Sequence, residues 1–348
     1  MVNEFKIGSF TIGKGYRPFI VAEMSGNHNQ SIDRALKIVK AAAGSGAHAI
    51  KLQTYTADTM TMKGALTITD KNSLWYGREL YELYQEAYTP WEWHKEIFEY
   101  ANSLGLIAFS TPFDESAVDF LEELKAPVYK VASFENTDLP LLKKIAQTGK
   151  PVIISTGAST IGDMHEAVKT LRENGCKELV LLKCTSTYPS TPENTNLMTI
   201  PSMRDVFNCH VGLSDHTMGI GVAVASVALG AVMIEKHFTL RRADGGVDST
   251  FSMEPEELAS LVVESERAFQ ALGEVQYGVQ SAEAKSLLYK RSIYIAKDIK
   301  AGDIITKENV RVIRPGDGLH TKYYDLVLGR KAKDSLKSGT PLTWDKLL

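Results

Sequence analysis

The chain has 348 residues, of which 44% are hydrophobic and 23% are charged, and its formal net charge at pH 7 is −3. This composition is typical of a folded globular protein and excludes disordered, collagen-like and coiled-coil classes. No basic excess indicates nucleic-acid binding, and glycines or charges interrupt every apolar stretch before the ~20 residues of a membrane helix. We therefore expect neither nucleic acid nor a membrane as a partner.

The cysteines indicate the compartment. Cys176, Cys184 and Cys209 are sparse and show no Cys-x-x-Cys spacing. This pattern favours a reducing cytoplasm over a disulfide framework or a zinc knuckle, and we interpret Cys184 as a small buried filler. The first 16 residues lack a charged stretch followed by an apolar one, so we expect no signal peptide.

Short apolar runs rich in Val and Ile alternate with amphipathic stretches over most of the chain. Eight such runs occur, at residues 18–23, 47–53, 106–111, 127–133, 151–155, 179–183, 211–214 and 231–237. Nearly continuous apolar character is typical of parallel strands buried on both faces. Helical patterns such as 32–43 and 90–103 lie between them. The sequence therefore predicts a (β/α)₈ barrel, a TIM barrel, over residues 1–272.

The pattern changes after Leu272. Residues 273–287 hold two glycines and no clear apolar core, and we interpret them as a linker. Residues 288–348 show short strand-like pieces separated by glycine turns, which indicates a small β-rich domain. A domain of about 60 residues is near the lower limit for independent stability, so we expect docking or dimerisation to support it.

Every predicted strand ends in a polar or ionisable residue. Active sites of such barrels lie at the carboxyl ends of the strands, so these side chains should share one face. Lys51, Lys130 and Lys183 end the second, fourth and sixth runs, and crowded lysines are costly unless an anion lies between them. With the hydroxyls of Thr111, Ser133, Ser155 and Ser214, they predict a site for a phosphate and a carboxylate. Taken alone, each lysine could equally be a paired structural charge.

His216 and His237 end the seventh and eighth runs. Neighbouring strands lie about 4.8 Å apart, so two such imidazoles can reach one ion. Water and substrate oxygens would complete a mixed N/O shell, which suits Mn²⁺ or another divalent cation such as Mg²⁺ or Co²⁺. The alternative for either histidine is a core residue bonded to a backbone carbonyl. His28 could contact substrate or simply belong to a turn that leads into a helix.

Glu23 and Glu135 are the candidate acid–base groups, because proton transfer needs a positioned carboxyl with a tuned pKa. Their alternative role is ion pairing with the nearby lysines. The residues do not decide which of the two would activate water.

Seven segments resemble the sialic-acid synthases, in the order in which that family has them. They are residues 22–29 (AEMSGNHN), 50–55 (IKLQTY), 109–114 (FSTPFD), 130–135 (KVASFE), 154–157 (ISTG), 212–217 (GLSDHT) and 234–239 (IEKHFT). Residues 314–318 (RPGDG) and 329–330 (GR) resemble the antifreeze-like (SAF) domain that ends these enzymes.

The resemblance implies condensation of phosphoenolpyruvate with an N-acylated amino sugar, giving a nine-carbon 2-keto acid and phosphate. Residues implied to hold phosphoenolpyruvate are Lys51, Thr111, Lys130, Ser133, Ser155 and Ser214, with His216 and His237 on Mn²⁺. Residues implied at the sugar are Gln53, Glu135, Ser186, Tyr188 and Asp248. Arg314 would reach the sugar in the partner subunit's barrel, since these enzymes are domain-swapped homodimers. The implied setting is surface glycan biosynthesis.

Within this family, residues 88–94 (YTPWEWH), 137–140 (TDLP) and 241–246 (RRADGG) resemble the pseudaminic acid synthases. The implied sugar is 2,4-diacetamido-2,4,6-trideoxy-L-altrose. N-acetylneuraminate synthases carry Gly-Pro-Asp-His where residues 242–249 (RADGGVDS) lack both the proline and the histidine.

Four alternatives remain. Legionaminate and N-acetylneuraminate synthases share the chemistry and differ in the sugar. A metal-dependent sugar isomerase would share the barrel, but it has no use for a phosphate-and-carboxylate site. A non-catalytic sugar- or ice-binding protein would need neither the metal-binding histidines nor the carboxylates.

Overall fold

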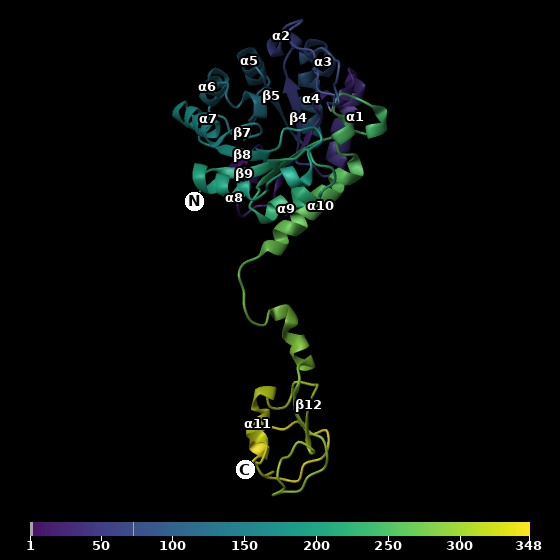
Figure 1. The fold of residues 1–348 in the computed structure, drawn as a ribbon, viewed down its shortest axis with the longest axis vertical. Helices are drawn as coiled ribbons and strands as arrows, with labels where there is room; N and C mark the ends of the chain where they lie inside the picture. The colour runs from purple at the N-terminus through teal and green to yellow at the C-terminus, as the bar shows by residue number, and fades with distance from the viewer. Residues whose placement is uncertain (1–2, 72) are drawn as a thin grey trace. The chain divides into compact units, whose positions relative to one another are not determined.

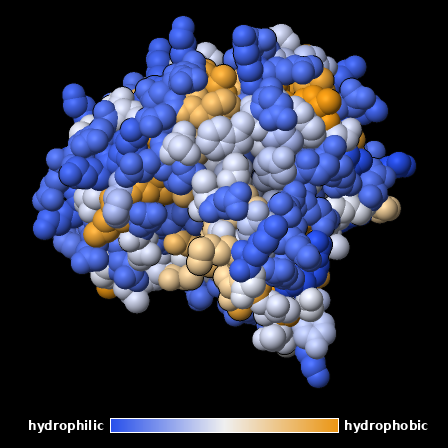
Figure 2. Space-filling model, turned by 90° about the horizontal axis from the view of Figure 1, so that it is seen from above, coloured by the Kyte–Doolittle hydropathy of each residue, from blue (hydrophilic) through white to orange (hydrophobic). Residues whose placement is uncertain are grey.

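The computed structural model describes residues 3–71 and 73–348. The described residues form two compact units, which divide between Gly273 and Glu274 and which we describe separately. No helix in the described ranges is long and apolar enough to cross a membrane. The visible surface is largely hydrophilic, with hydrophobic residues in separate patches (Figure 2).

Within the described residues of the first unit, eight parallel strands close into a barrel in the order β10-β3-β4-β5-β6-β7-β8-β9. This confirms the predicted TIM barrel. The strands are β3 (Phe19–Glu23), β4 (Ala49–Thr54), β5 (Ile107–Pro112), β6 (Tyr129–Val131), β7 (Val152–Ser155), β8 (Leu179–Cys184), β9 (His210–Ser214) and β10 (Met233–His237). Each overlaps one of the eight predicted runs.

Helices surround the barrel (Figure 1). They are α1 (Ile32–Gly44), α2 (Ala57–Met60), α3 (Leu80–Ala87), α4 (Trp91–Ser103), α5 (Glu115–Glu123), α6 (Leu139–Gln147), α7 (Ile161–Glu173), α8 (Thr199–Phe207), α9 (Gly221–Ala228) and α10 (Pro255–Leu272). Helix α1 illustrates why they form: the Ser31 side chain accepts a hydrogen bond from Arg34 N, and Ala35, Ile38, Val39 and Ala42 are buried on one face.

An N-terminal hairpin, which the sequence analysis did not predict, precedes the barrel. Strands β1 (Phe5–Ile7) and β2 (Phe10–Ile12) pair antiparallel around Gly8, whose φ is +57°. Ile7 and Ile12 are buried and join the apolar cluster that fills the barrel interior. The hairpin therefore covers residues that would otherwise face water.

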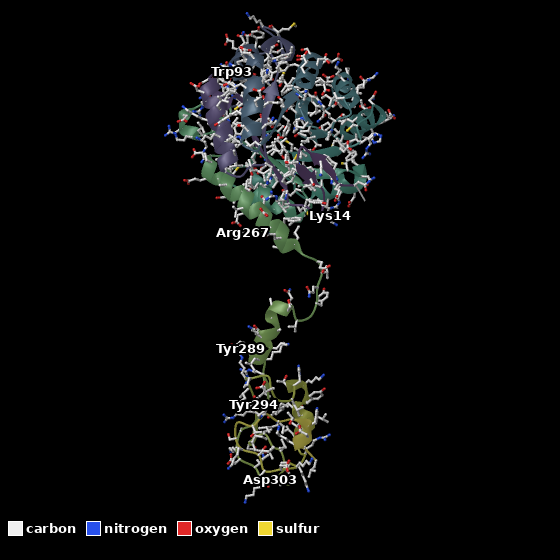
Figure 3. All side chains as sticks on the ribbon, turned by 180° about the vertical axis from the view of Figure 1, so that it is seen from behind. Lys14, Trp93, Arg267, Tyr289, Tyr294 and Asp303 are labelled. Atoms are coloured by element: carbon white, nitrogen blue, oxygen red, sulfur yellow. The ribbon has the colours of Figure 1, made fainter. Side chains whose placement is uncertain are left out.

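The second unit has its own core. Strands β11 (Ser292–Ile295) and β12 (Val310–Ile313) pair antiparallel, and a short helix α11 covers Tyr324–Val327. Its core includes Ile293, Ile305 and Leu342. A 3₁₀ helix, η6 (Ser281–Tyr289), lies where the sequence indicated a linker, and a capping box between Gln280 and Glu283 begins it. Its last residue, Tyr289, is 65% exposed (Figure 3).

Candidate active site

The alternation of side chains along each strand determines which polar groups enter the barrel, because successive residues point to opposite faces. One interior layer is apolar and contains Val21, Ala49, Phe109, Val128, Ile153, Leu182 and Met233. Two residues further along the strands, toward their carboxyl ends, the same faces carry Glu23, Lys51, Thr111, Lys130, Ser155, Cys184, Ser214 and Glu235. These polar residues are all buried. The apolar layer therefore forms the floor under a polar site.

Two lysines and two glutamates form the centre of this site. Lys51 Nζ lies 2.5 Å from Glu23 Oε2 and 3.7 Å from Glu235 Oε1. Lys130 Nζ lies 4.0 Å from Glu235 Oε1 and donates to Ser155 Oγ at 2.6 Å. The predicted crowding of positive charge is therefore offset by carboxylates of the protein itself. Sequence reasoning did not select Glu235 as a site residue, although its strand position indicates it.

Hydrogen bonds orient the members of this cluster. Lys51 Nζ also donates to Thr111 Oγ1 at 3.2 Å, and Gln53 Nε2 donates to Glu23 Oε1 at 3.2 Å. The backbone N–H of Ser25 donates to the same Glu23 oxygen at 3.1 Å. Burial raises the pKa of the Glu23 carboxyl, while the adjacent Lys51 ammonium acts in the opposite direction. Burial lowers the pKa of Lys130.

The structure does not bring Lys183 into the cluster, and the prediction of a third lysine there was wrong. Lys183 lies between the inward-facing Leu182 and Cys184 on β8, so its side chain takes the opposite face. Its Nζ donates to Cys184 O at 2.9 Å and to Thr185 Oγ1 at 3.3 Å. Asp215, which follows β9, is likewise outside the cluster and forms a buried ion pair with Lys236 at 2.7 Å.

Ser133, Glu135 and Ser186 lie beside the cluster, on the loops that follow β6 and β8. Ser133 and Glu135 belong to the 3₁₀ turn η2 (Ser133–Glu135), and Ser133 Oγ accepts from Gly157 N at 3.1 Å. A Cβ at residue 157 would lie 2.7 Å from Ser133 Oγ and closer still to Ser186 Oγ, so a larger residue there would displace both hydroxyls. The two hydroxyls therefore converge on one backbone position.

The Glu135 carboxyl differs from Glu23 in its surroundings. Its Oε2 is buried and has no hydrogen-bond partner among the described residues. Burial raises the pKa of Glu135 to about 7, and the more distant Lys130 only partly opposes this. A carboxyl that titrates near neutral pH and keeps a free oxygen is suited to proton transfer.

The two histidines meet at the mouth of the barrel. The ring centroids of His216 and His237 are 5.4 Å apart. His216 Nδ1 donates a hydrogen bond to Thr185 O at 3.0 Å, so the other ring nitrogen, Nε2, takes no part in this bond. Buried His237 Nδ1 has no hydrogen-bond partner in the described part of the chain and lies 3.8 Å from Asp248 Oδ2. Asp248 in turn accepts a short hydrogen bond from Ser25 Oγ.

These donors fit a divalent metal. Burial, together with His216 and the nearby lysines, lowers the pKa of His237 well below its usual value, and neutral imidazole is the form that binds metals. For His216 the effect of burial is outweighed by Cys184 and the Thr185 carbonyl, which raise its pKa. No group of three or more His, Cys, Asp or Glu side chains with metal-ligand geometry occurs in residues 3–71 and 73–348. A cation held by the two histidines would therefore need water or substrate oxygens to complete its shell.

An aromatic side chain covers the histidine pair. The Tyr188 ring lies 4.5 Å from the His216 ring and 5.3 Å from the Phe251 ring, between centroids. Phe251 in turn lies 4.9 Å from His237. Tyr188 was predicted to contact the sugar, whereas Phe251 was not identified from the sequence.

His28 has a structural environment. It is fully buried, its Nε2 lies 3.2 Å from Thr89 Oγ1, and its Nδ1 accepts from Gln30 N at 3.1 Å. These contacts are those expected if His28 belongs to the turn that leads into the next helix. Arg314 directly follows β12 in the second unit, so its predicted contact with a sugar stays a prediction.

Comparisons with known proteins identify relatives of this chain. Residues 38–277 match the NeuB family and residues 290–348 match the SAF domain. The chain is 43% identical to pseudaminic acid synthase of Campylobacter jejuni over 97% of this chain and 98% of that one. It is 36% identical to N,N'-diacetyllegionaminic acid synthase of the same species, over 92% and 97%.

A solved structure is also similar to this chain. The N-acetylneuraminic acid (sialic acid) synthetase of Leptospira borgpetersenii superposes with a TM-score of 0.75 at 30% identity, over 83% of this chain and 96% of that one. The resemblance to sialic-acid synthases is thereby confirmed. The match over residues 38–277 and the 43% identity over nearly the whole chain show that this chain belongs to the NeuB family.

Proposed function

We propose that this protein is a pseudaminic acid synthase, an enzyme that condenses phosphoenolpyruvate with 2,4-diacetamido-2,4,6-trideoxy-L-altrose. The observation that carries the proposal is the arrangement of Lys51 and Lys130 beside the histidine pair, which joins an anion site to a metal site in one barrel mouth. The 43% identity to a pseudaminic acid synthase over nearly the whole chain supports the choice of sugar.

Phosphoenolpyruvate would bind over the apolar floor. The Lys51 and Lys130 ammonium groups supply charge-assisted hydrogen bonds, and the hydroxyls of Thr111, Ser133, Ser155 and Ser214 supply further donors. Because Lys51 and Lys130 are held by Glu23, Glu235 and Ser155, they are oriented before the substrate arrives. Such preorganisation lowers the cost of stabilising charge during the reaction.

His216 and His237 would hold Mn²⁺ or a similar divalent cation. When bound there, the cation would polarise the aldehyde of the open-chain sugar. C3 of phosphoenolpyruvate then attacks that aldehyde carbon, and positive charge develops at C2. Water adds to C2, and phosphate departs with cleavage of its C–O bond.

Glu135 is our candidate for the group that takes the proton from this water. Both oxygens of Glu23 are engaged, one by Lys51 and the other by Ser25 N and Gln53. Burial raises the pKa of both carboxyls to about 7, so the free oxygen decides: Glu135 Oε2 is buried and has neither a hydrogen-bond nor an ion-pair partner among the described residues. Glu23 would instead position Lys51.

The sugar would bind at the outer side of the histidine pair, against Gln53, Ser186, Tyr188 and Asp248. The partner subunit's Arg314 would complete this site in a domain-swapped homodimer, and we place the enzyme in the cytoplasm, in surface glycan biosynthesis. A positively charged guanidinium is suited to bind an acyl oxygen.

The deciding experiment measures phosphate release from phosphoenolpyruvate in the presence of Mn²⁺. Three sugars are offered in parallel: the diacetamido-trideoxy-altrose, its manno-type counterpart and N-acetylmannosamine. Release with the first alone supports the proposal. Release only with one of the others retains the chemistry and overturns the sugar assignment. No release from folded, metal-loaded protein would favour the isomerase or binding-protein alternatives.

A further inference from the structure

Trp75 extends the aromatic surface that begins at the two histidines. It lies on the long segment between α2 and α3, and its ring centroid is 6.0 Å from that of Tyr188. Tyr188 contacts both His216 and Phe251, so the aromatic rings run without interruption from the histidines to Trp75. We call Trp75, Tyr188 and Phe251 the aromatic wall. Neither the sequence motifs nor the chemistry proposed above gives Trp75 a role.

A hydrogen bond fixes the orientation of the Trp75 indole. Its Nε1 donates to Val247 O at 3.2 Å, across 172 residues of sequence. Val247 directly precedes Asp248, whose carboxylate lies 3.8 Å from His237 Nδ1. The indole is therefore attached to the loop that carries a predicted sugar ligand, and it is only half-buried.

The chemistry of the wall differs from that of the remaining sugar ligands. An indole has a single polar atom, and in Trp75 this atom is already bonded to the protein. What Trp75 can offer to a ligand is consequently an apolar ring face. Gln53, Tyr188 and Asp248 supply polar atoms, so the site combines a hydrogen-bonding part with the apolar ring face of Trp75.

We propose that Trp75 is a specificity-determining residue that packs against the methyl-bearing end of the sugar and disfavours a hydroxyl at C6. This inference rests on the proposed function, because it concerns the sugar of that reaction. A 6-deoxy sugar with acetamido groups presents methyl groups that can pack on an aromatic face. A 6-hydroxyl against the Trp75 ring would lose water without gaining a partner from the indole, since the indole N–H is occupied.

Two variants separate direct contact from a role in positioning the loop. Trp75→Phe removes the hydrogen bond to Val247 but keeps an aromatic ring, whereas Trp75→Ala removes both. The matched control is Trp91→Phe, because Trp91 Nε1 also donates to a backbone carbonyl, Tyr55 O, at 3.2 Å while its ring packs on Phe120 away from the wall. Each protein is assayed with the 6-deoxy sugar and its 6-hydroxylated analogue.

We expect Trp75→Ala to raise KM for the 6-deoxy sugar at least about tenfold while KM for phosphoenolpyruvate stays unchanged, and to reduce the preference over the 6-hydroxylated analogue by a similar factor. Trp75→Phe should retain most of this preference, and Trp91→Phe all of it. Equal losses with both sugars in Trp75→Phe would show that Trp75 only positions the loop and would overturn the inference. An unchanged preference in Trp75→Ala would do the same.

The wild-type protein distinguishes this failure from failure of the proposed function. If it turns over the 6-deoxy sugar and the variants behave like it, the inference alone is wrong. If it releases no phosphate with any diacetamido-trideoxy sugar, the proposed function is wrong and the inference falls with it.

Discussion

Glu23 and Lys51 are register partners on adjacent strands, and their side chains form an ion pair with 2.5 Å between Oε2 and Nζ. Both residues are buried. Their pairing follows from the closed barrel, which places the ends of the two strands side by side with both side chains pointing into the barrel. The ion pair thus holds the Lys51 ammonium in the barrel mouth, where a phosphorylated substrate would need it.

Replacement of Lys51 tests the anion site. We expect Lys51→Ala to raise KM for phosphoenolpyruvate about 10- to 100-fold, because a hydrogen bond to a charged group contributes about 1.5–3 kcal/mol. KM for the sugar should change far less. Steady-state kinetics with each substrate varied in turn measures both values, and a circular dichroism spectrum establishes that the variant is folded.

Lys183→Ala is the matched control for Lys51→Ala. It removes the same group from a strand end, but from the outward face of β8. Its KM for phosphoenolpyruvate should remain within about twofold of the wild type. A large effect at Lys183, or equal effects of Lys51→Ala on both substrates, would contradict our assignment of the anion site.

The histidine pair is tested by direct metal binding as well as activity. His216→Ala and His237→Ala should each weaken Mn²⁺ binding about 10-fold or more and abolish metal-dependent turnover. Electron paramagnetic resonance of free Mn²⁺ measures binding without the reaction. His165→Ala, at an exposed position on α7, serves as control. Full activity of EDTA-treated wild-type enzyme would exclude the metal role.

The raised pKa of Glu135 should affect both activity and stability: with increasing pH, kcat should rise and the free energy of unfolding should fall. If Glu135 accepts the proton from water, kcat should rise with pH through about 7, and Glu135→Gln should lose most of its activity at every pH. Burial of the same carboxyl should make folding less favourable as pH rises. The pKa of Glu135 is higher in the folded than in the unfolded protein. The protonated carboxyl therefore contributes its full stability below about pH 4.3, and this contribution is lost as the pH rises through about 7.

Urea unfolding of wild type and Glu135→Gln at several pH values measures the second effect. The free energy of unfolding of the wild type should fall relative to that of the variant by up to about 3 kcal/mol between pH 4 and 8. A difference that stays constant with pH would mean that the Glu135 carboxyl titrates at its ordinary pKa in the folded protein.

Two buried histidines should make the stability of the folded protein sensitive to acid. Burial lowers the pKa values of His28 and His94 to about 4. Their folded-state pKa values lie below the unfolded value of about 6.5, so stability present above pH 6.5 is lost as pH falls toward 4. Relative to the wild type, His94→Gln should unfold with a weaker pH dependence, by up to about 3 kcal/mol over this interval. His165→Gln should leave the dependence unchanged.

The second unit is tested through Arg314. Arg314→Ala should raise KM for the sugar about 10-fold or more with little change in KM for phosphoenolpyruvate, because the proposed hydrogen bond from the guanidinium to the acyl oxygen would be lost. Arg311→Ala, on β12 of the same unit, is the matched control. Equal kinetics of Arg314→Ala and the wild type would exclude the proposed contact across subunits.

The barrel could be predicted because each buried strand is a short apolar run between helical patterns. The direction in which each strand's side chains point was harder to predict. Lys51 and Lys183 both lie near strand ends, yet only Lys51 points into the barrel. The position of Leu182 in the interior cluster shows which face β8 presents, and the same alternation identifies Glu235. That alternation cannot be assigned from a run such as Leu179–Leu182, which is apolar at every position and buried on both faces.

Other features depended on contacts distant in sequence. The alternating pattern of residues 5–12 around Gly8 and Ser9 is a hairpin signal, and this signal was present but overlooked. The aromatic wall had no such signal, because Trp75, Tyr188 and Phe251 lie on three separate loops. Only the closed barrel brings them together.

The opposite orientations of Lys51 and Lys183 also limit which insertions and deletions the sequence can accept. Deleting one residue within β4 would turn Lys51 toward the helices, as Lys183 already is, even though every residue type remained in place. Insertions between β4 and α4, by contrast, would leave the strand facing intact. We therefore expect insertions and deletions to occur in the loops, where we propose that the sugar is selected, while the strands accept substitutions only.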